Sequence, residues 1–146
     1  MAAEILKEAL KLLKPHLSSR NVGKTLGKVI VGTVKGDVHD IGKNIVVMTL
    51  ETAGFEVLDL GVVVPPESFA DNATSTGSRV VGLSVLMTTS FASMKETVDL
   101  IRTTGLRAKV MVGGGTTNET VAQSVGADAY GRTAVDAARI AKEWTM

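Results

Sequence analysis

One histidine stands in a sequence setting that suits metal ligation. Asp37 lies two residues before His39, and a carboxylate in that position can accept the proton of the imidazole nitrogen that faces away from a metal. This hydrogen bond would fix the tautomer and the orientation of the ring and make it a more basic ligand. For His16, the second histidine, we keep the simpler interpretation of a solvated residue or a helix-cap partner. For Asp40 the simpler role is also favoured, as the N-cap of a helix that starts at Ile41.

The composition limits which metal His39 could hold. The 146-residue chain contains no cysteine, which excludes a disulfide framework, a thiolate zinc site, an iron–sulfur cluster and a cysteine nucleophile. Zinc requires three or four protein ligands, whereas a metal that is already held by its own macrocycle needs only an axial ligand. A metal at His39 is therefore expected to arrive inside a macrocycle, of which haem is one candidate.

Three consecutive glycines form a second unusual feature. Gly113, Gly114 and Gly115 precede Thr116-Thr117, and such a stretch can be a flexible turn or can cradle a phosphate where a helix begins. It also suits a bulky group whose flat or extended part approaches the backbone closely. A cofactor that carries a nucleotide tail is compatible with the last two interpretations.

Short β-branched apolar runs alternate with helical patterns from Lys28 onward. We expect strands at residues 29–34, 57–60, 80–85, 109–112 and 127–130. We expect helices at about residues 41–53, from Pro65-Pro66 onward, and at about 91–102, 117–125 and 133–144. This alternation indicates an α/β fold with a doubly wound, five-stranded parallel sheet, and right-handed crossovers favour the flavodoxin-like order 2-1-3-4-5.

This fold would bring the unusual residues together. Doubly wound sheets bind ligands beyond the carboxyl ends of their strands, at the switch point, which here lies between the first and third strands. The loops at residues 35–44, 84–90 and 113–117 follow the first, third and fourth strands. We therefore expect them to form one site at one edge of the sheet.

The rest of the chain carries fewer functional signals. Residues 3–14 predict one amphipathic helix, which Pro15 ends, and residues 18–27 predict a small, polar linker. No apolar run approaches the roughly 20 residues needed to cross a bilayer, and the N-terminus has no export signal. We expect a cytoplasmic protein without membrane contact. A net charge of +1 with only one Trp, one Tyr and three Phe argues against nucleic acid as a partner.

Three motifs in register resemble a known family. Asp-x-His-x-x-Gly spans residues 37–42, Ser-x-Leu follows at 84–86 after 41 residues, and Gly-Gly follows at 113–114 after another 26 residues. With this spacing, residues from about 27 to 144 resemble the cobalamin-binding domain of corrinoid methyltransferase proteins and of cobalamin-dependent methionine synthase. The residues around the first motif are more similar to the methyl-transfer branch than to the adenosylcobalamin mutases.

The resemblance implies cobalamin or a related corrinoid, with its cobalt, as the cofactor. The corrinoid's own base would leave the cobalt, and His39 would replace it as the lower axial ligand and the metal-binding residue. Asp37 would hydrogen-bond His39 and Ser84 would support Asp37, so these three residues form the implied catalytic relay. The implied contacts to the ring or its nucleotide tail are Asp37, Val38, His39, Asp40, Ile41, Gly42, Ser84, Leu86, Met87, Thr88, Thr89, Gly113, Gly114, Gly115, Tyr130 and Gly131.

The implied function is that of a methyl carrier in one-carbon metabolism that is not catalytic alone. A donor methyltransferase would load the cobalt, an acceptor methyltransferase would unload it, and a reductive activase would be a third partner. The alternatives are the cobalamin-binding subunit of an adenosylcobalamin-dependent mutase and a cobalamin-based sensor module. A phosphoacceptor receiver of the same topology would need a carboxylate at the end of the third strand, where this chain has Ser84.

The implied domain organisation departs from the family at the N-terminus. Residues 27–146 correspond to the cobalamin-binding domain, which in the family follows a helical bundle that caps the upper face of the ring. Residues 1–26 leave room for about one helix and a linker, a remnant of such a cap. Either the chain is a fragment, or another chain supplies the cap.

Overall fold

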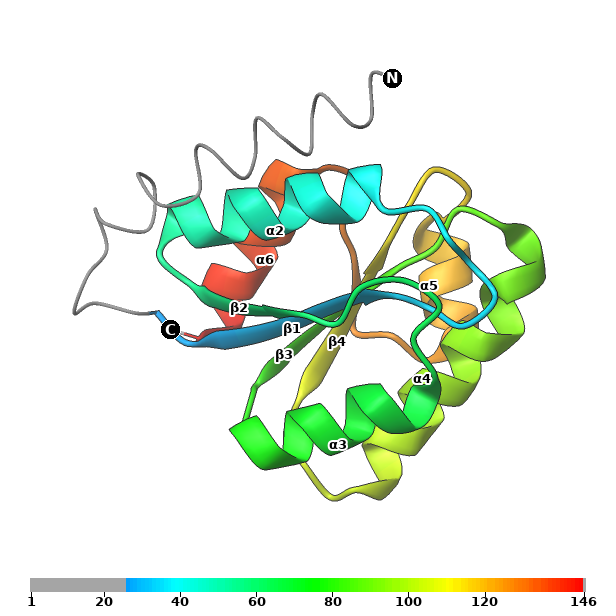
Figure 1. Ribbon diagram of the computed structural model, residues 1–146, viewed down its shortest axis with the longest axis horizontal. Coiled ribbons are helices and arrows are strands. Elements are labelled where there is room, and N and C mark those ends of the chain that lie inside the picture. Colours follow the sequence, from blue (N-terminus) through cyan, green and yellow to red (C-terminus); the bar gives the residue numbers. More distant parts are fainter. Residues whose placement is uncertain (1–25, 146) are drawn as a thin grey trace.

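The computed structural model describes residues 26–145, which form a five-stranded parallel sheet in the order β2-β1-β3-β4-β5 (Figure 1). The strands are β1 (Lys28–Thr33), β2 (Glu56–Asp59), β3 (Val80–Ser84), β4 (Lys109–Gly113) and β5 (Ala129–Tyr130). The helices are α2 (Ile41–Ala53), α3 (Pro66–Thr76), α4 (Phe91–Thr103), α5 (Glu119–Val125) and α6 (Ala134–Thr145), with a 3-10 turn η1 (Thr88–Ser90) before α4. The predicted flavodoxin-like fold is confirmed. The helix predicted at residues 3–14, most of the linker and His16 lie outside the described residues.

Both faces of the sheet are apolar, and helices cover both (Figure 1). Ile30, Val81 and Val110 are fully buried on the side of α3, α4 and α5. Val29 and Val80, which alternate with them, are fully buried on the side of α2 and α6. Each such side chain contributes roughly 1.5–3 kcal/mol when it is fully buried. The sheet is therefore a rigid base for the loops that leave it.

Besides β3, which ends at Ser84 rather than at residue 85, two elements are shorter than the sequence predicts, and side-chain hydrogen bonds explain both. α5 begins at Glu119 rather than near residue 117 because Asn118 takes the N-cap position, where its side chain accepts a backbone N–H of the first turn at 2.8 Å. β5 comprises only Ala129–Tyr130, since the preceding Asp128 uses its carboxylate to accept the Val110 backbone N–H at 2.8 Å. Neither difference changes the order of the elements.

The three predicted site loops leave the same edge of the sheet. β1 pairs with β3 as far as Thr33 and Ser84, and β3 pairs with β4 as far as Gly113. Two backbone hydrogen bonds continue the pairing, from the Val34 N–H to the Ser84 carbonyl at 3.1 Å and from the Val85 N–H to the Gly113 carbonyl at 3.0 Å. The carboxyl ends of β1, β3 and β4 are thus level, and the loops start side by side. Within residues 26–145, no helix is both long and apolar enough to cross a bilayer.

Candidate functional site

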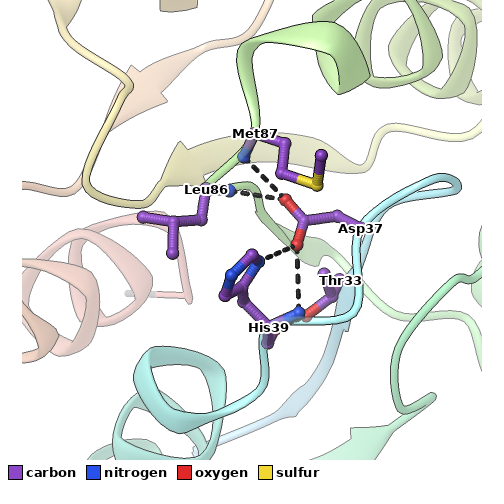
Figure 2. Close-up of polar contacts among 5 residues, drawn as sticks. All are labelled: Thr33, Asp37, His39, Leu86 and Met87. Carbon is purple, nitrogen blue, oxygen red and sulfur yellow. Dashed lines mark hydrogen bonds and ion pairs between the residues drawn. The ribbon is translucent and has the colours of Figure 1, made fainter.

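The buried carboxylate of Asp37 joins the loop after β1 to the loop after β3 (Figure 2). Its Oδ1 accepts the backbone N–H of His39 at 3.0 Å and lies 2.6 Å from Nδ1 of the same residue. Its Oδ2 accepts the backbone N–H groups of Leu86 at 2.6 Å and Met87 at 2.9 Å. The Asp37 side chain is 0% exposed, whereas that of His39 is 48% exposed. One carboxylate therefore fixes two loops and one accessible imidazole.

The hydrogen bonds keep Asp37 ionised despite its burial. Burial by itself raises the pKa of a carboxyl group, but the backbone N–H groups of Leu86, His39 and Met87, together with the His39 ring, lower the pKa of Asp37 to about 2. An ionised Asp37 can only accept hydrogen bonds, so Nδ1 of His39 must carry a proton. In a neutral ring Nε2 then has a free lone pair. This is the tautomer that binds a metal through Nε2.

The backbone near His39 is also held in place. The hydroxyl of Thr33, at the end of β1, donates to the His39 carbonyl at 2.8 Å. The preceding Gly36 has a φ of +89°, and a Cβ built on it would lie 3.1 Å from the hydroxyl oxygen of Ser90, which is 2% exposed. Glycine is therefore required at residue 36 both for the turn and for the close approach of the second loop. Ser90, which the sequence analysis does not name as a site residue, thus lies against the turn that precedes His39.

Ser84 occupies a different place from the one implied for it. The family resemblance implies that it supports Asp37; in the described part of the chain, the hydrogen bonds to the Asp37 carboxylate come from His39 and from backbone N–H groups after β3. Ser84 shares its face of β3 with Val80 and Gly82, which is the face toward α2 and α6. Its side chain therefore belongs with the cavity on that face rather than with the carboxylate.

A cavity of about 460 Å³ lies between the carboxyl ends of β1, β3 and β4 and the helices α2 and α6, and Gly42, in the first turn of the helix that follows His39, is part of its wall. Seven of the predicted contact residues line it, namely Gly42, Ser84, Gly113, Gly114, Gly115, Tyr130 and Gly131. Glycine is frequent in the wall, and α6 contributes Ala134 and Ala137. The cavity exists because these positions carry almost no side chain.

Two glycines of the cavity wall are there for different reasons. Gly114 has a φ of +130°, and a Cβ built on it would collide with the Val85 carbonyl oxygen. At Gly82, by contrast, a Cβ would make ordinary contacts of 3.5 Å with Val31 and 3.8 Å with Met111. Neither packing nor the backbone therefore demands glycine at residue 82, and its absent side chain leaves room in the cavity.

One unpartnered polar atom lies on the glycine-rich loop. The hydroxyl of Thr116 is buried without a hydrogen-bond partner in the described part of the chain, and buried polar groups normally have one. This loop and the neighbouring cavity together fit an extended, partly polar group such as the nucleotide tail of a corrinoid.

The surface around His39 is unusually apolar. Val38 is 65% exposed, Ile41 43%, Leu86 40% and Met87 41%. Exposed apolar side chains that cluster around a polar pair mark a binding surface rather than a solvated loop. The predicted contacts Thr88 and Thr89 are exposed in η1 next to this cluster, and Asp40 has the N-cap position of α2 without a side-chain cap hydrogen bond.

A free metal ion has too few ligands here. In residues 26–145 no three side chains of His, Cys, Asp or Glu are grouped so that they could hold one. A metal at His39 must therefore bring its remaining ligands with it, as cobalt does in the corrin ring.

The structure adds cavity residues that the sequence analysis does not name. Lys43 and Ile45 come from α2, and Arg132, Thr133 and Ala134 come from the start of α6 and the turn before it. The signal for the second group was available, because the carboxyl end of β5 lies at the same edge as those of β1, β3 and β4. Extending the loop argument to the fifth strand would have included it.

Comparison with known proteins identifies the family. Residues 27–139 match the family described as the B12 binding domain. The chain is 39% identical over 147 residues to a corrinoid protein of Desulfitobacterium hafniense strain Y51, and 41% identical over 145 residues to dimethylamine corrinoid protein 2 of Methanosarcina mazei. Each alignment covers 98% of this chain and 68% of the relative. The resemblance found in the sequence is confirmed.

Solved structures agree with this assignment. The monomethylamine corrinoid protein of Methanosarcina barkeri matches with a TM-score of 0.84 and 33% identity, over 98% of this chain and 68% of that one. A chain of the methanol:cobalamin methyltransferase complex of the same organism matches with a TM-score of 0.81 and 35% identity, over 87% of this chain and 50% of that one. A signal receiver domain from Mycobacterium tuberculosis matches with a TM-score of 0.60 at 17% identity, over 82% of this chain and 95% of that one, which concerns the fold alone. The chain belongs to the B12-binding domain family, and its cofactor is a corrinoid.

Proposed function

We propose that this protein carries a methyl group on the cobalt of a corrinoid, which it receives from a donor methyltransferase and delivers to an acceptor methyltransferase. The observation that carries the proposal is the Asp37–His39 pair at the switch point of a sheet that also holds a cavity of about 460 Å³ at the carboxyl ends of its strands. When bound, the corrinoid supplies a cobalt centre that can accept and release the methyl group.

In this proposal His39 is the lower axial ligand and Asp37 controls it. The ionised Asp37 holds the Nδ1 proton and so presents Nε2 for ligation. It also fixes the ring orientation, because the same carboxylate is bound by the Leu86 and Met87 backbone N–H groups. The exposed side chains of Val38 and Ile41 would lie against the ring.

The cavity would hold the nucleotide tail, in the conformation in which the corrinoid's own base has left the cobalt. Gly113, Gly114 and Gly115 would form its backbone wall, and Ser84 and Tyr130 would contact the tail from β3 and β5. The corrinoid would thus occupy two subsites, the surface around His39 and the cavity. The fold separates them, because His39 precedes α2 while the cavity lies between α2 and α6. One ligand that reaches both subsites would be bound more tightly than a ligand that reaches either one.

The partners are proposed from the relatives. Relatives named for dimethylamine and monomethylamine, and a chain of the methanol:cobalamin methyltransferase complex, belong to methyltransferase systems. We propose methyltransferases and a reductive activase as partners of this chain too. We also propose that the corrinoid-binding domain starts at residue 27, where the family match begins.

The test compares wild-type protein with His39→Ala after reconstitution with hydroxocobalamin. We expect the wild type to retain the corrinoid through gel filtration with an absorption spectrum in which a histidine has replaced the nucleotide base. His39→Ala should lose that spectrum while its circular dichroism stays unchanged, because the side chain is half exposed and packs in no core cluster. Identical spectra for the two proteins would contradict axial ligation by His39.

A further inference from the structure

The loop after β2 braces the loop that carries His39. The Val63 backbone N–H donates to the Asp37 carbonyl at 3.0 Å, and the Val64 backbone N–H donates to the Thr33 carbonyl at 3.0 Å. Residues 59–64 therefore bind the His39 loop both at its start and at the residue whose carboxylate holds the imidazole. We call residues 59–64 the brace.

A second pair of hydrogen bonds extends the brace to His39 itself. The Thr33 backbone N–H donates to the Gly61 carbonyl at 2.9 Å, while the Thr33 hydroxyl donates to the His39 carbonyl at 2.8 Å. Thr33 is fully buried, so it cannot shift without moving both Gly61 and His39. A displacement of the brace would consequently be transmitted to the backbone of His39.

An ion pair anchors the brace to α2. Nζ of Lys43, a side chain that is only 4% exposed, lies 2.7 and 2.8 Å from the two carboxylate oxygens of Asp59. Oδ1 of Asp59 also accepts the Gly61 backbone N–H at 2.9 Å. The carboxylate of Asp59 thus ties the first turn of the brace to a buried cation on the helix that begins just after His39.

The backbone of Val63 shows that the brace is held in a set conformation. Val63 has a φ of +52° and is the one non-glycine residue with positive φ in the described part of the chain. A β-branched residue is a strong outlier in this region and persists there only where its surroundings determine the conformation. This conformation is the one in which its N–H reaches the Asp37 carbonyl.

From these contacts we propose that Lys43 and Asp59 are positioning residues for His39. Through the brace they hold the backbone of the loop that would present the imidazole to the cobalt. The proposal rests on the proposed function, since it assumes ligation by His39. Neither residue contacts His39, so both act through the backbone of residues 61–64.

A merely structural role is the competing explanation, because a buried ion pair between α2 and β2 could stabilise the fold without affecting the ligand. The two roles differ in one measurable respect. A positioning residue matters for corrinoid binding only while His39 is present, whereas a general structural defect weakens binding with or without His39.

The test is a double-mutant cycle between Asp59→Asn and His39→Ala, with hydroxocobalamin as the probe. Asp59 is the better variant because Lys43 also lines the cavity and Asp59 does not. We expect Asp59→Asn to weaken affinity about tenfold, in the range found for outer residues of metal sites, and to reduce the histidine-ligated absorption. In the His39→Ala background the same substitution should change affinity less than about twofold. Asp99→Asn is the matched control, since it breaks an exposed ion pair with Lys95, and it should change nothing.

A measurement on the cofactor-free protein supplies a second readout. Asp59→Asn should speed amide hydrogen exchange at Asp37 and Val63, with exchange in α4 unchanged. If Asp59→Asn fails to fold, the double variant Lys43→Met/Asp59→Asn removes both charges together and replaces it in the exchange experiment, where no ligand is present and the place of Lys43 in the cavity wall does not matter.

The outcomes separate this proposal from the proposed function. If wild type and His39→Ala give the same spectrum and affinity, the proposed function fails and the role of Lys43 and Asp59 fails with it. If His39 ligation holds but Asp59→Asn weakens binding equally in both backgrounds, or in neither, only the positioning role is overturned. Unchanged exchange at Asp37 and Val63 would overturn it as well.

Discussion

The chemistry of the site depends on which groups form hydrogen bonds with the Asp37 carboxylate. Two oxygens accept three backbone N–H groups and the imidazole Nδ1. The negative charge is therefore stabilised mainly by the backbone of two loops rather than by a cation. This arrangement lets the carboxylate stay ionised in a buried position and still act on His39.

Removal of this carboxylate should destabilise the protein before any ligand is added. Asp37→Ala leaves the backbone N–H groups of His39, Leu86 and Met87 without their acceptor in a partly buried setting, and an unsatisfied buried group costs roughly 1–3 kcal/mol. We expect the free energy of unfolding of the corrinoid-free protein to fall by about 3 kcal/mol in urea titrations. Asp71→Ala, on the exposed side of α3, should change it by less than about 0.5 kcal/mol. Equal stability of the two variants would contradict the role assigned to the carboxylate.

Adjacent glycines should differ sharply in their tolerance of a methyl group. At Gly114 an added Cβ meets the Val85 carbonyl and the φ is +130°, whereas at Gly115 it meets only the Cδ1 end of Leu86, at 2.9 Å. Gly114→Ala should therefore lower the free energy of unfolding by about 2 kcal/mol or more and weaken corrinoid binding. Gly115→Ala should have a smaller effect on both stability and corrinoid binding. Thermal melting and hydroxocobalamin titration of the two variants check this order, which a merely flexible loop would not produce.

At the scale of the elements, the site is made by the ends of strands and the starts of helices. β1 delivers the His39 loop, β3 delivers the N–H groups that bind Asp37, and β4 delivers the glycine wall. The cavity itself requires a gap between the sheet and the α2–α6 pair. Gly82 provides part of that gap in the middle of an otherwise apolar strand.

Filling this gap should lower the affinity for the corrinoid without lowering the stability of the protein. Gly82→Val places a side chain favoured in strands into the cavity, and its Cβ makes only ordinary contacts. We expect the melting temperature of the corrinoid-free protein to stay the same or to rise, while affinity for cobalamin falls at least about tenfold. Affinity for cobinamide, which lacks the nucleotide tail, should change much less. If both ligands lost affinity equally, the cavity would not be the site of the tail.

The sequence predicted most of this architecture because each level of it leaves a pattern in residue types. Alternating apolar runs located all five strands, and the fold that they indicate placed the loops at residues 35–44, 84–90 and 113–117 at one edge. Contacts made by the backbone leave no such pattern. The N–H groups that bind Asp37 could equally belong to other residue types, so only the resemblance offered a partner for this carboxylate, the Ser84 hydroxyl. The left-handed Val63 was unpredictable for a related reason, since residue type argues against that conformation.

At the scale of the whole molecule, the fold by itself does not select the function. A receiver domain at 17% identity has the same arrangement of elements, so the difference lies in the loops at the carboxyl edge. Those loops present two subsites, an imidazole surrounded by exposed apolar side chains and a separate cavity lined by glycines. A ligand that occupies both subsites should stabilise the whole domain, since their walls come from β1, β3, β4, β5, α2 and α6.

Because a bound ligand stabilises the folded domain, different ligands should raise the melting temperature by different amounts. A ligand present at one hundred times its dissociation constant stabilises the folded state by about 2.7 kcal/mol, which corresponds to roughly 5–10 °C for a domain of this size. At one fixed concentration, cobalamin should raise the melting temperature of the wild type most, and cobinamide should raise it less because the cavity stays empty. His39→Ala should reduce the effect of both ligands, whereas Gly82→Val should reduce mainly that of cobalamin. Equal shifts for the two ligands in the wild type would mean that only the surface around His39 binds the corrinoid and that the cavity serves another purpose.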